Sequence, residues 1–215
     1  MAQPPDEILE KPRVKEILAR AASVYSRVGY SAGSIRDLAK ALNIKSASLY
    51  HWFDSKEDIL FAIMLDFHRS FVSEVTPVAE LDGAPDQIMR QVVEAHIRFD
   101  VQRWDQVVIG ISERRSLSPE RRHVINRLRR QHRDAIVKLV VAGAAPGSWA
   151  AAEPKIVASV ILDTINGLVQ WYQQRGEADL QHIISIFASN AVALLSVPRN
   201  AAPLRRTTRR RAKTR

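Results

Sequence analysis

The stretch Ile35-Arg-Asp-Leu-Ala-Lys-Ala-Leu-Asn43-Ile-Lys-Ser-Ala-Ser-Leu-Tyr50-His-Trp-Phe53 decides the fold of this chain. Its apolar residues recur at helical spacing on both sides of Asn43, which predicts two short helices joined by a tight turn. Asn tolerates the left-handed backbone of such a turn better than most residues other than glycine. Two helices joined in this way form a helix-turn-helix unit, whose second helix enters the major groove of DNA.

Hydroxyl and carboxylate pairs set the helix boundaries on either side of this unit. Ser34 precedes Asp37 by three residues, and Ser55 precedes Asp58 by the same distance. This is the spacing of a capping box, with Asp in place of the usual Glu. We therefore expect a helix to begin just after Ser34 and a long helix to run over residues 56–76.

Helical periodicity continues over most of the remaining chain. The predicted helices cover residues 12–29, 35–42, 45–52, 56–76, 88–100, 103–112, 118–141, 150–174 and 179–197. No segment alternates with the period of two that is typical of a strand. The sequence therefore predicts an all-α chain of about nine helices, with its clearest internal break at residues 77–85, where proline and glycine gather.

The composition excludes several classes of protein. The chain has 215 residues, of which 46% are hydrophobic, so it can bury a sizeable core. It has no cysteine, which removes disulfides, thiolate metal ligands and cysteine nucleophiles. No apolar run of about 18 residues occurs, and residues 1–11 lack the apolar stretch of a secretory signal. We expect no membrane-spanning helix, no contact with a membrane, and a cytoplasmic location.

The net charge of +9 is unevenly distributed. Residues 198–215 contain eight basic residues and no acidic one, so the rest of the chain is nearly neutral. Such a block is either a solubilising end or an arm that attracts the phosphates of nucleic acid. We expect this tail to be disordered, and also residues 1–11, which hold few apolar side chains.

Over residues 13–61 the chain resembles the TetR family of bacterial transcriptional regulators. The resemblance is carried by Ile17-Leu-x-Ala-Ala, Gly29-Tyr30, Ser34-Ile-Arg-Asp-Leu-Ala39, Ser48-Leu-Tyr50-His-Trp-Phe53 and Ser55-Lys-Glu-Asp-Ile-Leu60. Asn43 stands where the family often has Gly, and Ser34 where it often has Thr. Both replacements keep the backbone or hydroxyl role.

The resemblance implies a three-helix DNA-binding head and a larger helical body that binds a small molecule. It also implies a homodimer, usually formed through the last two helices, and repression that the small molecule relieves. We accordingly expect a head at residues 12–57 and a ligand-binding and dimerisation body at residues 58–197. The segments 1–11 and 198–215 would flank them.

The expected DNA contacts lie at and beside the second helix of the unit. Residues at its start reach base edges, and short side chains there give sparse base readout, so DNA shape should contribute. The residues at this start are Lys45, Ser46, Ala47 and Ser48. Three further positions, Tyr50, His51 and Lys56, resemble phosphate-contacting positions of the family, and Ser34 can reach a phosphate besides capping.

The body offers candidate ligand and dimer residues but names no ligand. The helix at residues 118–141 carries seven basic residues, which form either a solvated face or a site for an anion such as a carboxylate or the phosphates of an acyl-CoA. The candidate ligand-binding residues are Met89, His96, Phe99, Trp104, Arg129 and Asn166, of which the apolar and aromatic ones are more often plain core. The candidate dimer residues are Asp163, Gly167 and Trp171, where polar and small residues interrupt an apolar helix. The segment Asn166-Gly-x-x-x-Trp171-Tyr172 is also similar to segments of family members linked to lipid or acyl-CoA metabolism.

Two other classes of function are alternatives to a ligand-responsive regulator. An all-α enzyme has no support, because no nucleophile elbow, phosphate loop, dinucleotide fingerprint or zinc-protease motif occurs, and the six histidines lack metal-ligand spacing. We therefore expect no catalytic residue, cofactor or metal. The second class is a constitutive or architectural DNA-binding protein whose body only dimerises, which a solid body without a cavity would favour. The expected partners remain an operator in double-stranded DNA, a second copy of the chain and a small-molecule effector.

Overall fold

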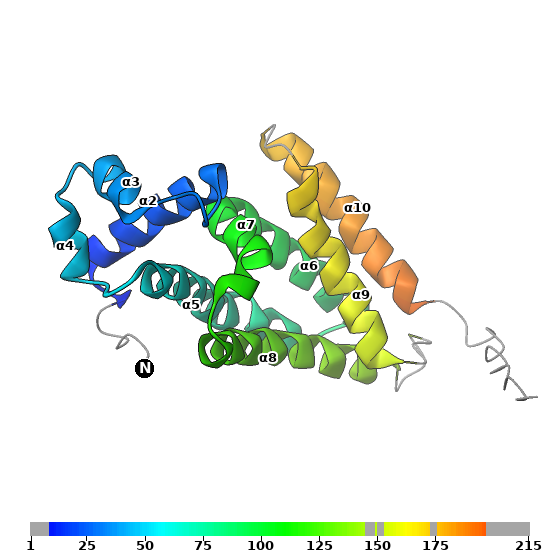
Figure 1. Ribbon diagram of the computed structural model, residues 1–215. Coiled ribbons are helices and arrows are strands. Elements are labelled where there is room, and N and C mark those ends of the chain that lie inside the picture. Colours follow the sequence, from blue (N-terminus) through cyan, green and yellow to red (C-terminus); the bar gives the residue numbers. More distant parts are fainter. Residues whose placement is uncertain (1–8, 145–148, 150–152, 173–175, 197–215) are drawn as a thin grey trace, which may run out of the picture.

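The computed structural model describes residues 9–144, 149, 153–172 and 176–196, and these residues form helices joined by turns (Figure 1). The helices are α2 (Pro12–Val28), α3 (Ile35–Ala41), α4 (Ser46–Tyr50), α5 (Lys56–Glu74), α6 (Pro85–Gln102), α7 (Trp104–Ser112), α8 (Pro119–Ala144), α9 (Pro154–Asn166) and α10 (Glu177–Leu195), with 3-10 turns η1 (Thr76–Glu80), η2 (Arg114–Ser116) and η3 (Gly167–Gln170). The prediction of an all-α chain is confirmed for this part of the sequence. The predicted basic tail lies outside the described residues.

Local chemistry fixes the helix ends of the head as the sequence predicts. The Ser34 side chain accepts a hydrogen bond from the Asp37 amide while the Asp37 carboxylate accepts one from the Ser34 amide, which completes the capping box. The Ser55 hydroxyl caps α5 by accepting a hydrogen bond of 3.1 Å from the Asp58 amide, which is one half of the predicted capping box. Asn43 has a φ of 52°, the left-handed conformation expected of the turn between α3 and α4. These contacts place α4 at the outer edge of the head.

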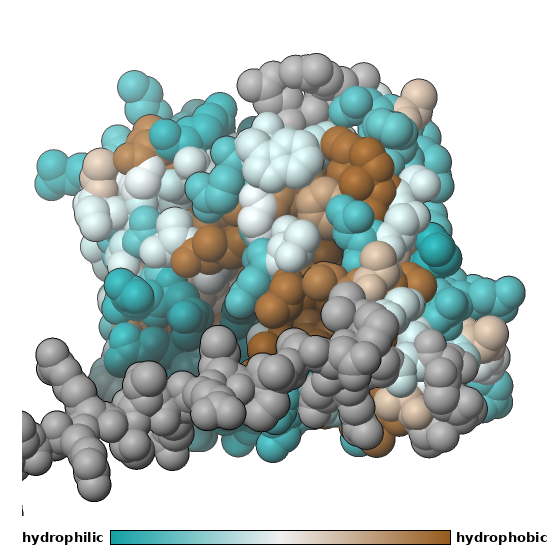
Figure 2. Space-filling view, turned by 90° about the vertical axis from the view of Figure 1, so that its right-hand side faces the viewer, coloured by the Kyte–Doolittle hydropathy of each residue, from teal (hydrophilic) through white to brown (hydrophobic). Residues whose placement is uncertain are grey.

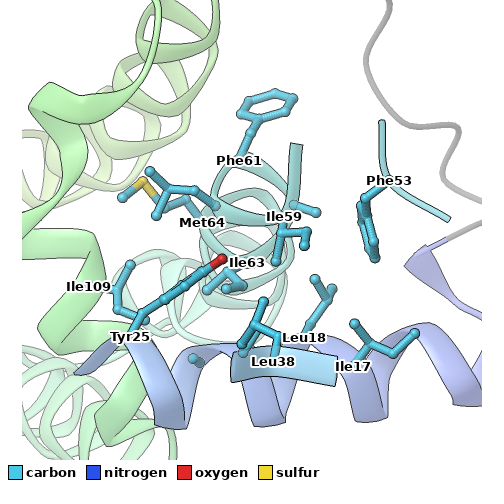
Figure 3. Close-up of a cluster of buried hydrophobic side chains, with 14 of the residues drawn as sticks. Ile17, Leu18, Tyr25, Leu38, Phe53, Ile59, Phe61, Ile63, Met64 and Ile109 are labelled. Atoms are coloured by element: carbon cyan, nitrogen blue, oxygen red, sulfur yellow. The ribbon is translucent and has the colours of Figure 1, made fainter. Parts of the chain in front are cut away.

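One apolar core joins the head to the start of the body. Ile17, Leu18 and Tyr25 of α2 face Leu38 of α3 and the first turns of α5, as Figure 3 shows. The same cluster includes Ile109 of α7 and residues Leu117 and Ile125 at and near the start of α8. The head is therefore packed against α7 and α8, and α5 runs unbroken through the predicted boundary at residues 57 and 58. Leu9 is also buried in this core, so the prediction of disorder for residues 1–11 is wrong at its last residues.

The body packs α5 to α10 around a second core. α10 lies along α6, and α9 lies beside α8 and α10, so that α9 and α10 together cover one side of the molecule (Figure 1). Phe67 and Phe71 of α5 form a smaller aromatic cluster with Phe99 of α6, between the two larger cores. Five helices, α5 to α9, therefore surround the middle of the body.

The structure corrects three predicted helix ranges. α4 spans only Ser46–Tyr50, because residues 51–54 turn to bring Phe53 into the head core before Ser55 starts α5. The predicted helix at residues 56–76 ends at Glu74, and Pro77 lies in the 3-10 turn that follows. The predicted helix at residues 150–174 begins at Pro154 and ends at Asn166. Gly167, a weak helix former, opens a 3-10 turn there.

One helix qualifies by length and composition as a membrane span, although the sequence predicted none. α10 has a window of mean hydropathy 1.3 with at most two charged residues, because small and apolar residues dominate without forming an unbroken apolar run. One face of this helix, with Leu180, Ile184 and Ala188, is buried against the rest of the body. A single apolar helix that packs in this way is weak evidence for a membrane.

Candidate functional site

The outer surface of the head presents the predicted base-contacting residues to solvent. Lys45, Ala47 and Ser48 are exposed, and Ser46 is half-buried, at the start of α4. Leu49 points the other way and is buried in the head core. α4 therefore places a cation, a methyl group and hydroxyls on its free side, which is a set of groups that can meet base edges.

The predicted phosphate-contacting residues differ in how free they are. Tyr50 is 52% exposed, and His51 is exposed with its ring packed edge-on against Trp52 at 5.0 Å between ring centroids. Lys56 is turned inward: its ammonium donates a hydrogen bond of 3.2 Å to the Ser31 carbonyl and lies 4.2 Å from the centroid of the Tyr30 ring. Burial lowers the pKa of Lys56 from its usual value.

Ser34 is also engaged within the head. Its hydroxyl donates to the Asp37 carboxylate at 2.6 Å and accepts from the Asp37 amide at 3.2 Å. The side-chain hydrogen bond from Ser34, followed by the one from its amide, holds the pKa of Asp37 below its usual value. The ionised carboxylate therefore holds the hydroxyl proton of Ser34, and a phosphate would have to compete for it.

A cavity of about 230 Å³ lies in the body between α5, α6, α7, α8 and α9. Its lining combines the aromatic rings of α5 with polar and charged side chains from the other helices. The lining includes Phe71, His68, His96, Asp100, Arg129 and His132. The cavity is therefore apolar on the α5 side and polar towards α8 and α9, which suits an amphipathic molecule.

The cavity contains three of the predicted ligand residues and omits the other three. His96, Arg129 and Asn166 line it. Met89 is fully buried in the core shared by α6, α8 and α9, and Trp104 packs edge-on against Tyr172 at 5.8 Å between ring centroids. Phe99 stands one layer behind the lining, against the rings of Phe67 and Phe71. These apolar candidates are core residues, the alternative that the sequence left open.

Sequence reasoning missed two histidines of the lining, His68 on α5 and His132 on α8. The available signal was weak. His132 follows Arg129 by three residues and so shares its helix face, and His68 stands on an otherwise apolar helix. Burial, followed by nearby positive charge, lowers the pKa of His68 to about 3, and burial followed by His96 and Arg129 lowers that of His132 to about 3. Both rings are therefore neutral near neutral pH.

The predicted dimer residues lie around the end of α9. Asp163 is exposed and also borders the cavity. Gly167 ends α9 and has open space where a side chain would stand. Among the described residues, no second helix therefore packs closely against it. Trp171 is 58% exposed, with its ring 6.2 Å from that of Phe187 on α10.

Two helices that line the cavity also hold the head. α8 carries Arg129 and His132 in the cavity, while two turns earlier Arg121 forms ion pairs with Asp58 and Glu57 at the start of α5. The Ser118 amide donates a further hydrogen bond of 2.9 Å to the Glu57 carboxylate. A movement of α8 at the cavity therefore reaches the helix that follows the helix-turn-helix unit.

α7 forms the second connection. Its residues Val107 and Gly110 line the cavity, and Ile109 lies on its other face against the head core. The Ser26 hydroxyl of α2 also donates a hydrogen bond to the Asp105 carboxylate at the start of α7. The described residues contain no group of three or more His, Asp or Glu side chains that could hold a metal ion.

Two family models match the chain. The model described as "Bacterial regulatory proteins, tetR family" matches residues 17–63, and the model described as "Tetracyclin repressor-like, C-terminal domain" matches residues 82–195. Among curated proteins, the HTH-type transcriptional repressor KstR2 of Mycolicibacterium smegmatis is 29% identical over 174 residues, which are 80% of this chain and 84% of that protein.

Solved structures share the arrangement of helices. The TetR family transcriptional regulator PfmR from Thermus thermophilus superposes with a TM-score of 0.77 at 28% identity, over 82% of this chain and 97% of that one. AibR, in complex with isovaleryl coenzyme A and operator DNA, superposes with a TM-score of 0.75 at 24% identity, over 86% of this chain and 99% of that one.

Proposed function

Because this chain belongs to the TetR family of bacterial regulatory proteins, we propose that it is a repressor that binds a palindromic operator as a homodimer and is released by a small molecule. The observation that carries the proposal is that α7 and α8 each contact the cavity at one stretch and the head at another. Occupancy of the cavity and the position of the head are thereby mechanically connected.

DNA recognition is assigned to the free side of α4. Lys45, Ala47 and Ser48 would face base edges, while Tyr50 and His51 would contact phosphates and fix the register. Because the base-reading side chains are few and short, DNA shape should supply part of the specificity. Lys56 and Ser34 have a structural role within the head in addition to any phosphate contact.

The homodimer is assigned to the face formed by α9 and α10. This face carries large apolar side chains that are exposed in the single chain: Ile156, Val160, Trp171, Ile186 and Leu194. Figure 2 looks onto this side of the molecule and displays hydrophobic side chains gathered across it. Exposed apolar area of this kind, spread over two adjacent helices, is typical of a protein–protein interface.

The effector is a small apolar or amphipathic molecule that enters the cavity between α5 and α9. The neighbour AibR, which shares this fold, is described with both isovaleryl coenzyme A and operator DNA, so an acyl-CoA-type effector is one form that the proposal takes. For the effector to release DNA, it must bind the conformation with displaced heads more tightly than the operator-bound one.

A constitutive architectural DNA-binding protein is the alternative. Such a protein has no use for a cavity lined by three buried histidines, because a buried ring nitrogen without a partner costs stability. The cavity therefore favours a ligand-responsive regulator over a protein whose body only dimerises.

Selection from random duplex DNA with the full chain, followed by sequencing, tests the proposal. A dimer of such heads should recover a palindromic motif whose half-sites lie about 34–36 Å apart or moderately further. A matched pair of variants, Ala47→Asp on the free side of α4 and Glu80→Asp on the exposed surface of the body, should respectively abolish and retain this recovery. Recovery of no motif by the unaltered chain would refute sequence-specific binding.

A further inference from the structure

Three buried imidazoles line the cavity, and each has a ring nitrogen without a hydrogen-bond partner among the described residues. These atoms are Nε2 of His68, Nδ1 of His96 and Nε2 of His132, and the three side chains are only 4 to 7% exposed. Buried polar atoms in proteins nearly always have a partner, since leaving one unpaired destabilises the fold. The three side chains with such atoms come from α5, α6 and α8 and all line one cavity, which points to a polar group of a bound molecule.

The other ring nitrogens show how the histidines are held. His132 Nδ1 lies 3.1 Å from the Thr76 hydroxyl, and His96 Nε2 lies 3.4 Å from the Asp100 carboxylate. The Phe71 ring packs edge-on between both imidazoles, with 4.7 Å between its centroid and each of theirs. The rings of His96 and His132 are thus held in place, and the His68 ring packs edge-on against Phe67 at 5.1 Å between centroids, which suits selective recognition of a hydroxyl or keto group.

Arg129 supplies the charge in this cavity. Its side chain is half-buried, and among the described residues no carboxylate lies within 4.0 Å of its guanidinium, although Asp163 and Asp100 act on its charge from further away. Burial, followed by the neighbouring Arg114, lowers its pKa from the usual value. Of the two acids that border the cavity, Asp100 faces His96 and Asp163 is exposed to water. A half-buried guanidinium that lines a cavity and has no ion-pair partner among the described residues can pair with an anion, and a carboxylate fits its planar set of donors.

The volume of the cavity limits the size of that anion. At about 30 Å³ for each free water, 230 Å³ equals the volume of about eight waters, and the bonded atoms of an organic acid lie closer together than separate waters do. A coenzyme A thioester is several times larger than this. A compact organic acid with a short aliphatic or aromatic body matches both the volume and the apolar wall formed by Phe67, Phe71 and Leu162.

We propose that the effector is a compact organic acid, whose carboxylate pairs with Arg129 and whose hydroxyl or keto group bonds to the free nitrogens of His68, His96 and His132. This identification rests on the regulatory function proposed above, because it names the molecule that occupies the same cavity. A free acid should therefore bind better than a coenzyme A thioester. It should also bind better than a neutral or cationic molecule of equal size.

Calorimetric titration of the full chain with a matched panel tests the charge and the size. The panel is mandelate, phenylacetate, hexanoate, hexanol, phenethylamine and hexanoyl coenzyme A. The acids should bind, and mandelate should bind more tightly than phenylacetate because it adds one hydroxyl. Equal binding of hexanol and hexanoate, tighter binding of hexanoyl coenzyme A than of hexanoate, or binding of no acid would each overturn the proposal.

Substitutions at the cavity test the residues. Arg129→Gln should weaken the binding of phenylacetate about 10- to 100-fold, as expected for loss of a charged hydrogen-bonded pair, while Arg130→Gln on the exposed side of the same helix should leave it unchanged. Arg129→Lys changes the same position but keeps the charge, and it should retain part of the affinity. If Arg129→Gln lost binding only through misfolding at this position, Arg129→Lys would lose it as well. Equal affinity of Arg129→Gln and Arg130→Gln would overturn the assignment.

Two further measurements test the role of the histidines and distinguish a failure of this inference from a failure of the proposed repressor function. The double substitution His68→Phe with His132→Phe should remove the preference for mandelate over phenylacetate while phenylacetate still binds; a preference that persists would refute the role of these rings. Operator affinity is measured in parallel without ligand. A chain that selects an operator but binds none of the acids contradicts this inference alone, whereas a chain that binds acids but selects no DNA motif contradicts the proposed repressor.

Discussion

The ion pairs of Arg121 provide the sharpest test of how the head is held to the body. The Arg121 side chain is 9% exposed and contacts the carboxylates of Asp58 and Glu57, while its guanidinium lies 5.3 Å from the centroid of the Phe61 ring. Arg121→Met keeps the apolar volume and removes the charge. The expected result is a less stable protein in which α8 no longer grips the start of α5.

The size of the effect follows from how buried each partner is. Removing one member of a fully buried ion pair costs about 3–5 kcal/mol, but the carboxylates of Asp58 and Glu57 are 20% and 31% exposed and can partly rehydrate. We therefore expect a loss of about 2 kcal/mol in the free energy of unfolding, or about 4–8 °C in Tm for a domain of this size. Arg127→Met on the exposed face of α8 is the matched control and should lower Tm by less than about 2 °C.

The pH dependence identifies the cause of this loss. Burial raises the pKa of Asp58, but hydrogen bonds from Ser55 and Arg121 outweigh it, so the pKa lies below its usual value. A depressed folded-state pKa contributes stability that is present above the unfolded value, about 3.9, and is lost as pH falls through the folded value. Chemical denaturation should therefore show the difference between wild type and Arg121→Met at neutral pH, and the difference should shrink below about pH 4. A variant as stable as Arg127→Met, or a difference that acid leaves unchanged, would refute the reasoning.

Four further changes have expected outcomes. Tyr50→Phe should weaken binding to all DNA duplexes without changing their ranking in fluorescence anisotropy, and a changed ranking would place the hydroxyl on a base. Deletion of residues 198–215 should lower affinity at low salt and flatten its salt dependence while the operator preference persists; loss of that preference would contradict the tail's role as a non-specific arm. Trp171→Asp should convert the dimer to monomer in sedimentation velocity, and an intact dimer would move the interface away from this residue. Ser55→Ala should cost about 1 kcal/mol by thermal denaturation through loss of the α5 cap, whereas an unchanged Tm would mean that Asp58 caps the helix alone.

The head could be predicted from sequence because its determinants are local. The capping box of Ser34 and Asp37, the left-handed Asn43 and the start of α5 after Ser55 each depend on residues within three positions of one another. The exposed side of α4 follows from the same periodicity, since Leu49 must face the core.

The cavity could be predicted only in part, because its lining comes from five helices that are distant in sequence. Arg129 was predicted as one of many arginines on α8. No sequence pattern distinguished it from Arg127 and Arg130, which are exposed. His68 and His132 were missed because they stand on α5 and α8, which only the fold brings together at the cavity. The break of α9 at Gly167 was missed because helical apolar spacing continues through it.

Filling the cavity with a covalent group tests directly whether it controls DNA binding, whatever the natural effector is. The chain has no cysteine, so Leu162→Cys in the cavity and Arg130→Cys on the exposed face of α8 can each be labelled uniquely with thiol reagents of increasing size. Labelling at residue 162 should weaken binding to the selected operator by about 5- to 150-fold, the usual range of allosteric coupling, and labelling at residue 130 should leave it unchanged. An operator affinity that stays the same for every reagent at residue 162 would contradict the claim that the cavity and the head are coupled.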